Sequence, residues 1–182
     1  MNKEKIKESF FYFFKIGRSQ QIMLGVFLIL FSIILFASMI SYFNTWKVDQ
    51  SELDSFFELN SESKNIARKF GSIISHFLIY KMFGIASFIF SFLFFISGVT
   101  FFVGAKSKKL IDKWFWGLYG MIWISVFISF NFSNKMYGGS IGLELSDVIT
   151  VYIGEIGIIS MLIFGFIYFL VDFFKIRPEN VY

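Results

Sequence analysis

The chain has 182 residues, of which 56% are apolar and 23% aromatic, and its mean hydropathy is +0.67. A soluble domain of this length could not bury its 29 phenylalanine side chains, so the composition indicates an integral membrane protein. There is no cysteine, which excludes disulfide frameworks and thiolate sites. The net charge is +4, and the lysines lie beside apolar segments, where they are more simply interpreted as topology signals than as a nucleic-acid-binding surface.

The chain begins with a basic arm, residues 1–21, which we expect in the cytoplasm. Ile6, Phe10, Phe13 and Phe14 recur at helical spacing with charged residues on other faces, which predicts an interfacial helix. A flexible arm whose aromatic side chains only touch lipid headgroups is the alternative. The apolar run that follows is too long for a signal-peptide core and no A-x-A-like site comes after it, so it is expected to stay as an anchor.

Four apolar runs are long enough to cross a membrane, since a hydrocarbon core of about 30 Å needs about 20 helical residues. The third run is rich in tryptophan, as in an interfacial aromatic belt. The predicted spans are about 22–43, 82–104, 114–130 and 151–171; together they make a membrane domain, 22–171, followed by the cytoplasmic start of a linker, 172–182.

Lysine and arginine are unevenly distributed among the segments that join the spans. The N-terminal arm carries five, the short loop 105–113 carries four and the C-terminal tail two. The loop 131–150 has only Lys135 against two acids, and the loop 44–69 has four basic residues against five acids. The positive-inside rule therefore predicts that both termini are cytoplasmic and that the two longer loops face outward.

Two amphipathic segments, 66–80 and 137–152, precede the second and fourth spans. Each has a Gly-x-x-x-Ser motif, then an ionisable residue, then glycine ahead of the next span. These residues are Gly71, Ser75, His76 and Gly84 in the first segment, and Gly142, Ser146, Asp147, Gly154 and Gly157 in the second. Both segments are too polar and short to cross, so we expect them on the outer leaflet or dipping into it.

The predicted fold is thus all-α. It is a polytopic membrane protein with four transmembrane helices and two extracytoplasmic amphipathic or re-entrant segments, arranged as a parallel two-fold repeat. Gly71, Gly84, Gly154, Gly157 and Gly165 are assigned to close helix packing.

Few residues suggest chemistry. The sequence has no G-x-x-x-x-G-K-[ST] phosphate loop. The single histidine, His76, reads more simply as a satisfied or interfacial residue than as a metal ligand, and nothing in the spacing supports a triad with Ser75 and Asp147. Glu155 lies one turn inside the fourth span, where it is either an interfacial carboxylate, paired for example with Lys81, or a functional charge. We therefore expect no catalytic, cofactor or metal site.

Three strings carry a resemblance to a known family. They are Ser41–Ser51 (SYFNTWKVDQS), Gly71–Phe88 (GSIISHFLIYKMFGIASF) and Gly138–Leu145 (GGSIGLEL). With the four-span topology, they make the chain resemble the N-terminal membrane domain of the FtsK/SpoIIIE DNA translocases, most closely the form found in Bacteroidetes-type bacteria. The resemblance covers essentially the whole chain.

The resemblance implies a cell-division protein of the bacterial inner membrane. In that family this domain lies at the division septum and contacts other divisome proteins, while a cytoplasmic ATP-driven motor, joined by a linker, moves DNA for chromosome partition. The chain lacks the motor and the DNA-reading domain, so ATPase activity is not carried over and this fragment is not expected to bind nucleic acid. Expected partners are membrane lipids, divisome proteins and further copies of the chain, since the full-length family forms hexamers.

A second hypothesis belongs to a different class. The two-fold repeat could form a small transporter or channel, with Glu155 and Asp147 lining its path. Helices broken at the midplane would favour it, but the second and fourth spans read as continuous there.

Overall fold

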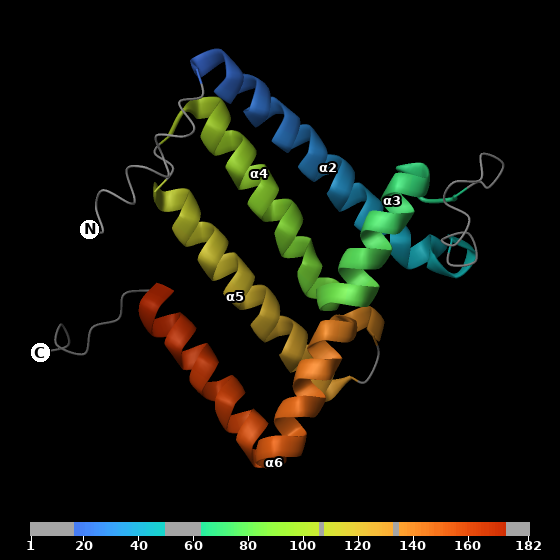
Figure 1. Ribbon diagram of the computed structural model, residues 1–182, viewed down its shortest axis with the longest axis vertical. Coiled ribbons are helices and arrows are strands. Elements are labelled where there is room, and N and C mark those ends of the chain that lie inside the picture. The colour runs from blue at the N-terminus through green and yellow to red at the C-terminus, as the bar shows by residue number, and fades with distance from the viewer. Residues whose placement is uncertain (1–16, 50–62, 106–107, 133–134, 174–182) are drawn as a thin grey trace, which may run out of the picture.

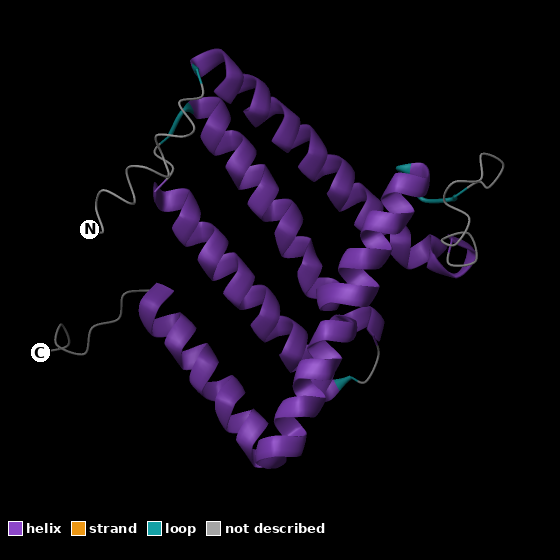
Figure 2. Ribbon diagram, viewed as in Figure 1, coloured by secondary structure: helices purple, strands orange, loops and turns teal. Residues whose placement is uncertain are grey.

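Figure 1 shows the computed structural model, which describes residues 17–49, 63–105, 108–132 and 135–173. Within these ranges every regular element is a helix (Figure 2). In chain order the elements are α2 (Arg18–Asp49), α3 (Arg68–Ser75), the π-helix η2 (His76–Phe83), the 3-10 helix η3 (Gly84–Ser87), α4 (Phe88–Val103), α5 (Lys108–Asn131) and α6 (Lys135–Phe173). The interfacial helix predicted in the N-terminal arm and the start of the linker lie outside the described residues.

Four helical stretches are long and apolar enough to span a membrane. They cover Arg18–Trp46, Arg68–Val103, Leu110–Asn131 and Tyr137–Phe173. The prediction of an all-α, four-span, multi-pass membrane protein is therefore confirmed. The second and fourth stretches have 36 and 37 residues, well above the length that one crossing needs, because each joins a short helix to a spanning one.

The spanning helices form a row. In Figure 1, α2, α4, α5 and the last part of α6 run side by side in that order, and each neighbouring pair is in contact. The start of α2, the end of α4, the start of α5 and the end of α6 meet at one end of the row, which we call the Arg18 end. At the opposite end, the Gly84 end, α3 with η2 and the first part of α6 lie across the spanning helices and touch each other.

Glycine makes the corners between transverse and spanning helices. Gly84 (φ 63°) stands between η2 and η3, and Gly154 (φ 73°, ψ 175°) divides α6. Backbone with φ near +70° and ψ near 180° is accessible almost only to glycine. We call residues 140–153 the transverse arm of α6 and residues 155–173 its spanning arm; Gly139 (φ 74°) lies where the transverse arm begins.

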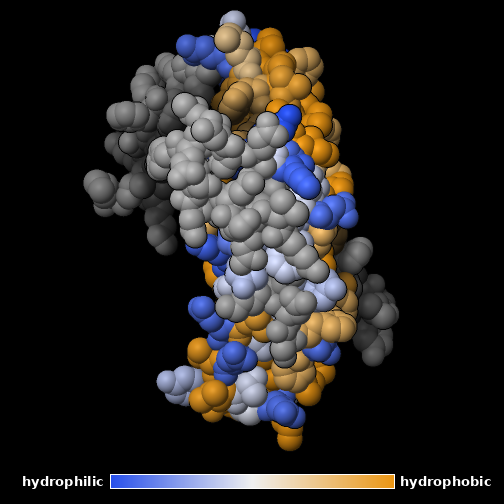
Figure 3. All heavy atoms as spheres, turned by 90° about the vertical axis from the view of Figure 1, so that its right-hand side faces the viewer, coloured by the Kyte–Doolittle hydropathy of each residue, from blue (hydrophilic) through white to orange (hydrophobic). Residues whose placement is uncertain are grey.

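Apolar cores join neighbouring helices but leave much apolar surface outside. Leu35, Met39, Tyr42 and Ile79 form one buried cluster between α2 and η2. Val126, Ile158 and Leu162 form another between α5 and the spanning arm. Phe83, Ala86 and Met121 form a third, which joins η2 and η3 to α5. Figure 3 shows apolar side chains reaching the surface over much of the molecule's height, as expected of helices that face lipid.

Candidate functional site

The ionisable residues singled out in the sequence lie at the Gly84 end, but they do not come together. His76 is half-buried, with its Nδ1 3.0 Å from the Tyr42 hydroxyl and its ring stacked on Tyr80. Asp147 and Glu155 are exposed on the two arms of α6, and within the described ranges no ion pair joins Glu155 to the exposed Lys81. The described residues also hold no group of three or more His, Cys, Asp or Glu side chains that could bind a metal ion.

Asn65 anchors the chain to α2 just before the first transverse helix. Its Nδ2 donates to the Ser38 carbonyl at 2.9 Å, and its Oδ1 accepts from the Ala67 amide at 3.1 Å. A Cβ at Gly71 would overlap that same Oδ1, so glycine is needed for α3 to lie against Asn65. Sequence reasoning missed Asn65; an asparagine two residues ahead of a helical amide donor is the turn-forming pattern that could have revealed it.

Where the two transverse helices cross, their backbones are in contact with no side chain between them. A Cβ on Gly84 would overlap the carbonyl of Tyr137, and one on Gly139 would overlap the carbonyl of Met82. One hydrogen bond spans the crossing, since Ser140 Oγ donates to the Tyr80 carbonyl at 3.1 Å. Beside it, Ser125 Oγ of α5 donates to the Gly138 carbonyl at 2.5 Å and holds the start of α6 to α5. This crossing connects the two halves of the chain, and the short polar side chains there satisfy carbonyl groups that water cannot reach.

The first and second spanning helices pack through Gly25 and Gly98. A Cβ on Gly25 would lie 2.6 Å from the Phe102 amide, and one on Gly98 would lie 2.8 Å from the Gly25 carbonyl. Toward the Arg18 end, the guanidinium of Arg18 donates to the carbonyls of Phe101 (3.2 Å) and Phe102 (2.7 Å), which caps the C-terminus of α4 with a positive charge.

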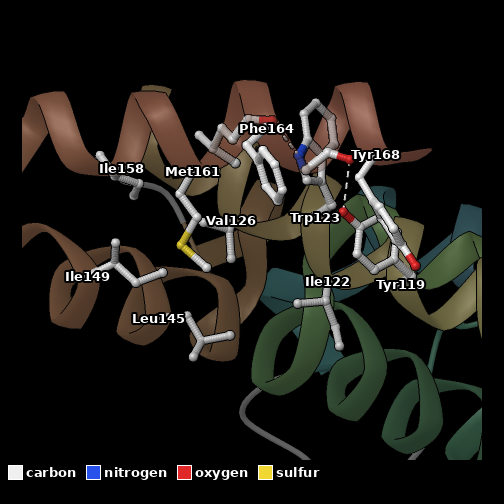
Figure 4. A pocket seen from close by; sticks show the side chains of 12 residues that line it. Tyr119, Ile122, Trp123, Val126, Leu145, Ile149, Ile158, Met161, Phe164 and Tyr168 are labelled. Atoms are coloured by element: carbon white, nitrogen blue, oxygen red, sulfur yellow. Dashed lines mark hydrogen bonds between the residues drawn. The ribbon is translucent and has the colours of Figure 1, made fainter. Parts of the chain in front are cut away.

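Tyr119 and Trp123 attach the spanning arm of α6 to α5. Tyr119 Oη donates to the Gly165 carbonyl at 2.8 Å, and Trp123 Nε1 donates to the Leu162 carbonyl at 3.0 Å. Gly165 makes room for both rings, since a Cβ there would lie 2.9 Å from Tyr119 Oη. Beside these bonds, α5 and the two arms of α6 enclose an apolar groove of about 560 Å³ (Figure 4).

The glycines that the sequence assigned to helix packing differ in how crowded their surroundings are. Gly71, Gly84 and Gly165 lie against neighbouring elements, as described above. Gly157 lies against the Ile153 side chain across the corner, whereas a Cβ on Gly154 would meet nothing within 4 Å. Gly25 and Gly98 were missed, although an isolated glycine in mid-span is the usual signal for close helix approach.

The interactions described above are mainly contacts between helices. Among the described residues, the partner that orients His76 is the phenol of Tyr42 and not a carboxylate, and Ser75 Oγ is buried without a hydrogen-bond partner. A serine nucleophile needs a base within hydrogen-bond reach, and the described residues offer none to Ser75 Oγ.

A comparison with known families gives one match. The family model for the 4TM region of DNA translocase FtsK/SpoIIIE matches residues 17–178. No curated protein and no solved structure matches the chain. The match spans all four membrane-crossing stretches and both transverse helices.

Proposed function

Since the chain belongs to the family of the 4TM region of DNA translocase FtsK/SpoIIIE, we propose that it anchors an ATP-driven DNA motor to the inner membrane at the division septum. The observation that carries the proposal is the family match over residues 17–178, which include every membrane-crossing stretch. The role of these residues is to hold and place the motor during chromosome segregation, not to hydrolyse ATP or contact DNA.

The proposed orientation puts the Arg18 end in the cytoplasm. The start of α2 and the end of α6 share this end, so an arm before α2 and a linker after α6 would lie on one side of the membrane. The short basic loop 105–113 belongs to the same end, in agreement with the positive-inside rule. The Gly84 end then faces outward, with the transverse helices and the two longer loops.

The outward end is the proposed contact surface for other divisome proteins. It carries the segments 44–69 and 131–150, which join the spans and hold most of the acidic residues of the chain. Copies of the chain would assemble around the motor that they anchor, as hexamers in the full-length family.

The proposed architecture is a parallel repeat whose transverse helices dip into the outer leaflet. In each half the Gly-x-x-x-Ser glycine lies against serine on the preceding spanning helix: Gly71 against Ser38, and Gly142 against Ser125 and Ser129. Helix α4 has only 16 residues, about 24 Å at 1.5 Å per residue, which is short of a hydrocarbon core of about 30 Å. The elements before α4 would therefore have to complete the crossing, which supports re-entrant placement.

The transporter alternative receives little support. Asp147 and Glu155 are exposed on the two arms of α6. The groove between α5 and α6 is lined by apolar and aromatic residues and contains neither carboxylate. A transport path needs polar groups that replace the hydration of its substrate, whereas the polar side chains in this lining are only Tyr119, Trp123 and Tyr168, the first two of which already donate to carbonyls of α6.

The test is to fuse the 182 residues to a fluorescent protein and image dividing cells. An anchor should concentrate at mid-cell, and crosslinking should capture membrane division proteins. Purified chain in liposomes should show neither nucleotide hydrolysis nor ion flux, and Glu155→Gln should leave localisation unchanged. A uniform signal around the envelope together with an ion flux abolished by Glu155→Gln would reject the anchor in favour of the transporter.

A further inference from the structure

The proposed anchoring role makes no use of the groove between α5 and α6. Its volume is about 560 Å³, which is within the usual range for ligand pockets. Figure 4 shows side chains from α5, including Trp123, facing those from the transverse arm, including Leu145, and from the spanning arm, including Ile158. The groove exists because Gly154 turns the two arms of α6 apart while Trp123 holds the spanning arm to α5.

The surroundings of the groove determine what can fill it. All its lining residues belong to the stretches Leu110–Asn131 and Tyr137–Phe173, which are apolar enough to cross a membrane. The polar atoms of Tyr119 and Trp123 at its wall already donate to carbonyls of the spanning arm. Water would find few hydrogen-bond partners here, so a hydrocarbon chain is the occupant that matches the lining.

Charge at the mouth of the groove selects the headgroup. Glu155 is not itself a lining residue, but it precedes Ile158 by three residues and Leu162 by seven, spacings that put it at the edge of the helix face that lines the groove. Glu155 is exposed at the Gly84 end of the spanning arm. Between Tyr137 and Val171 the charged residues are Glu144, Asp147 and Glu155, all of them acidic. An anionic headgroup would be repelled there, whereas an ammonium group would be attracted.

We propose that this groove binds one phospholipid with an amine-bearing headgroup. Its acyl chain lies along Trp123 and Leu162, and its ammonium group meets the Glu155 carboxylate. The pairing would also give a physical reason for a carboxylate at the membrane boundary. The ammonium group of the lipid would supply Glu155 with a counter-charge, and no ion pair within the described part of the chain does so. The inference rests on the membrane-spanning architecture and not on the septal role, so either can fail alone.

The experiment uses quenching of Trp123 fluorescence by brominated lipid. The chain is placed in vesicles of equal parts phosphatidylethanolamine and phosphatidylglycerol, with bromine on the acyl chains of one lipid or the other. Trp46→Phe, Trp114→Phe and Trp116→Phe leave Trp123 as the sole emitter; the difference between the unaltered chain and Trp123→Phe gives the same signal if that triple variant does not fold. We expect occupancy by the ethanolamine lipid to exceed that by the glycerol lipid about two- to fivefold, as an exposed ion pair allows.

Three variants separate the parts of the site. Glu155→Gln should make the two labels quench equally, and Asp147→Asn is the matched control that should keep the preference, because Asp147 lies on the other side of the transverse arm from Leu145. Ile122→Phe, a change at a half-exposed lining residue, should reduce quenching by both labels. Equal quenching in the unaltered chain would overturn the proposal. So would weak quenching by both labels, the result expected if a second copy of the chain filled the groove.

Discussion

Gly154 shows how one residue sets the course of α6. Its φ of 73° and ψ of 175° lie where residues with a Cβ are strained, although a Cβ would meet no atom within 4 Å. Gly154→Ala should therefore destabilise the fold by about 1–3 kcal/mol through backbone strain alone. Equilibrium unfolding in mixed micelles, followed by circular dichroism, measures the change.

Gly120 provides the matched control for that substitution. It also has open space around its Cα, but it lies inside α5 and has no positive φ. Gly120→Ala should be neutral or stabilising by up to about 1 kcal/mol, since alanine favours helix. Equal effects of the two substitutions would show that the corner at Gly154 is not strained by a side chain.

At this scale the sequence could locate special glycines but not distinguish their roles. The Gly-x-x-x-Ser spacing pointed to Gly71, and the position ahead of the second span pointed to Gly84; the structure shows the surroundings of both to be crowded. Gly154 was assigned to packing by the same reasoning, yet its surroundings are open and its backbone conformation is what requires glycine. A sequence contains no φ angle, so lack of space and need for positive φ look alike. The turn that Asn65 forms with Ala67 is a local pattern, but its bond to α2 could not be foreseen because the partner, Ser38, is 27 residues away.

Among the elements, α2 and α4 make the closest pairing of spanning helices through Gly25 and Gly98. Lipid tails are as apolar as leucine, so such pairs are held by close packing rather than by the hydrophobic effect. Gly98→Leu would place a branched side chain where a Cβ alone would be 2.8 Å from the Gly25 carbonyl. We expect a loss of about 1–3 kcal/mol or more as the helices separate.

The pairing can be checked by thermal unfolding in detergent, with monodispersity followed by size-exclusion chromatography. Gly120→Leu is the control, because it adds the same side chain to α5 where no atom lies within 4 Å of the Cβ position. A melting temperature lowered equally by both substitutions would mean that leucine itself, and not the α2–α4 contact, causes the loss.

The elements also show what hydropathy can and cannot predict. The four spans could be predicted because the thickness of the hydrocarbon core fixes how many apolar residues a crossing helix needs, and such runs can be counted in the sequence. The amphipathic segments were visible because serine and charged residues interrupt the apolar pattern. The junctions were not: Met82 to Ser87 read as the start of a span but form the end of η2 and the turn of η3. Their geometry depends on a crossing with Tyr137 and Gly139, which lie more than fifty residues later.

Taken whole, the described chain is a layer of helices and not a closed bundle. No contact joins α2 to α5 or α6 in the ranges that the structure describes. The halves meet through α4 with α5, through η2 and η3 with α5, and through the transverse crossing. Large apolar side chains on the spanning arm remain exposed, with Ile156 at 83% and Phe164 at 72%. In a membrane these faces require lipid or other protein chains as partners, which agrees with an anchor that works inside a larger assembly.

The orientation of the whole molecule can be tested by cysteine labelling, and the absence of native cysteine makes single additions unambiguous. Ser61→Cys and Ser133→Cys fall in the two loops proposed to face outward, and Ser107→Cys falls in the short basic loop at the Arg18 end. In intact cells, with any outer membrane permeabilised, an impermeant maleimide should label the first two and not the third. Labelling of Ser107→Cys after the inner membrane is opened by detergent is the control for its reactivity. Because all four spans are connected in one row, reaction of Ser107→Cys without reaction of Ser61→Cys in intact cells would reverse the orientation of the entire domain and place the transverse helices in the cytoplasm.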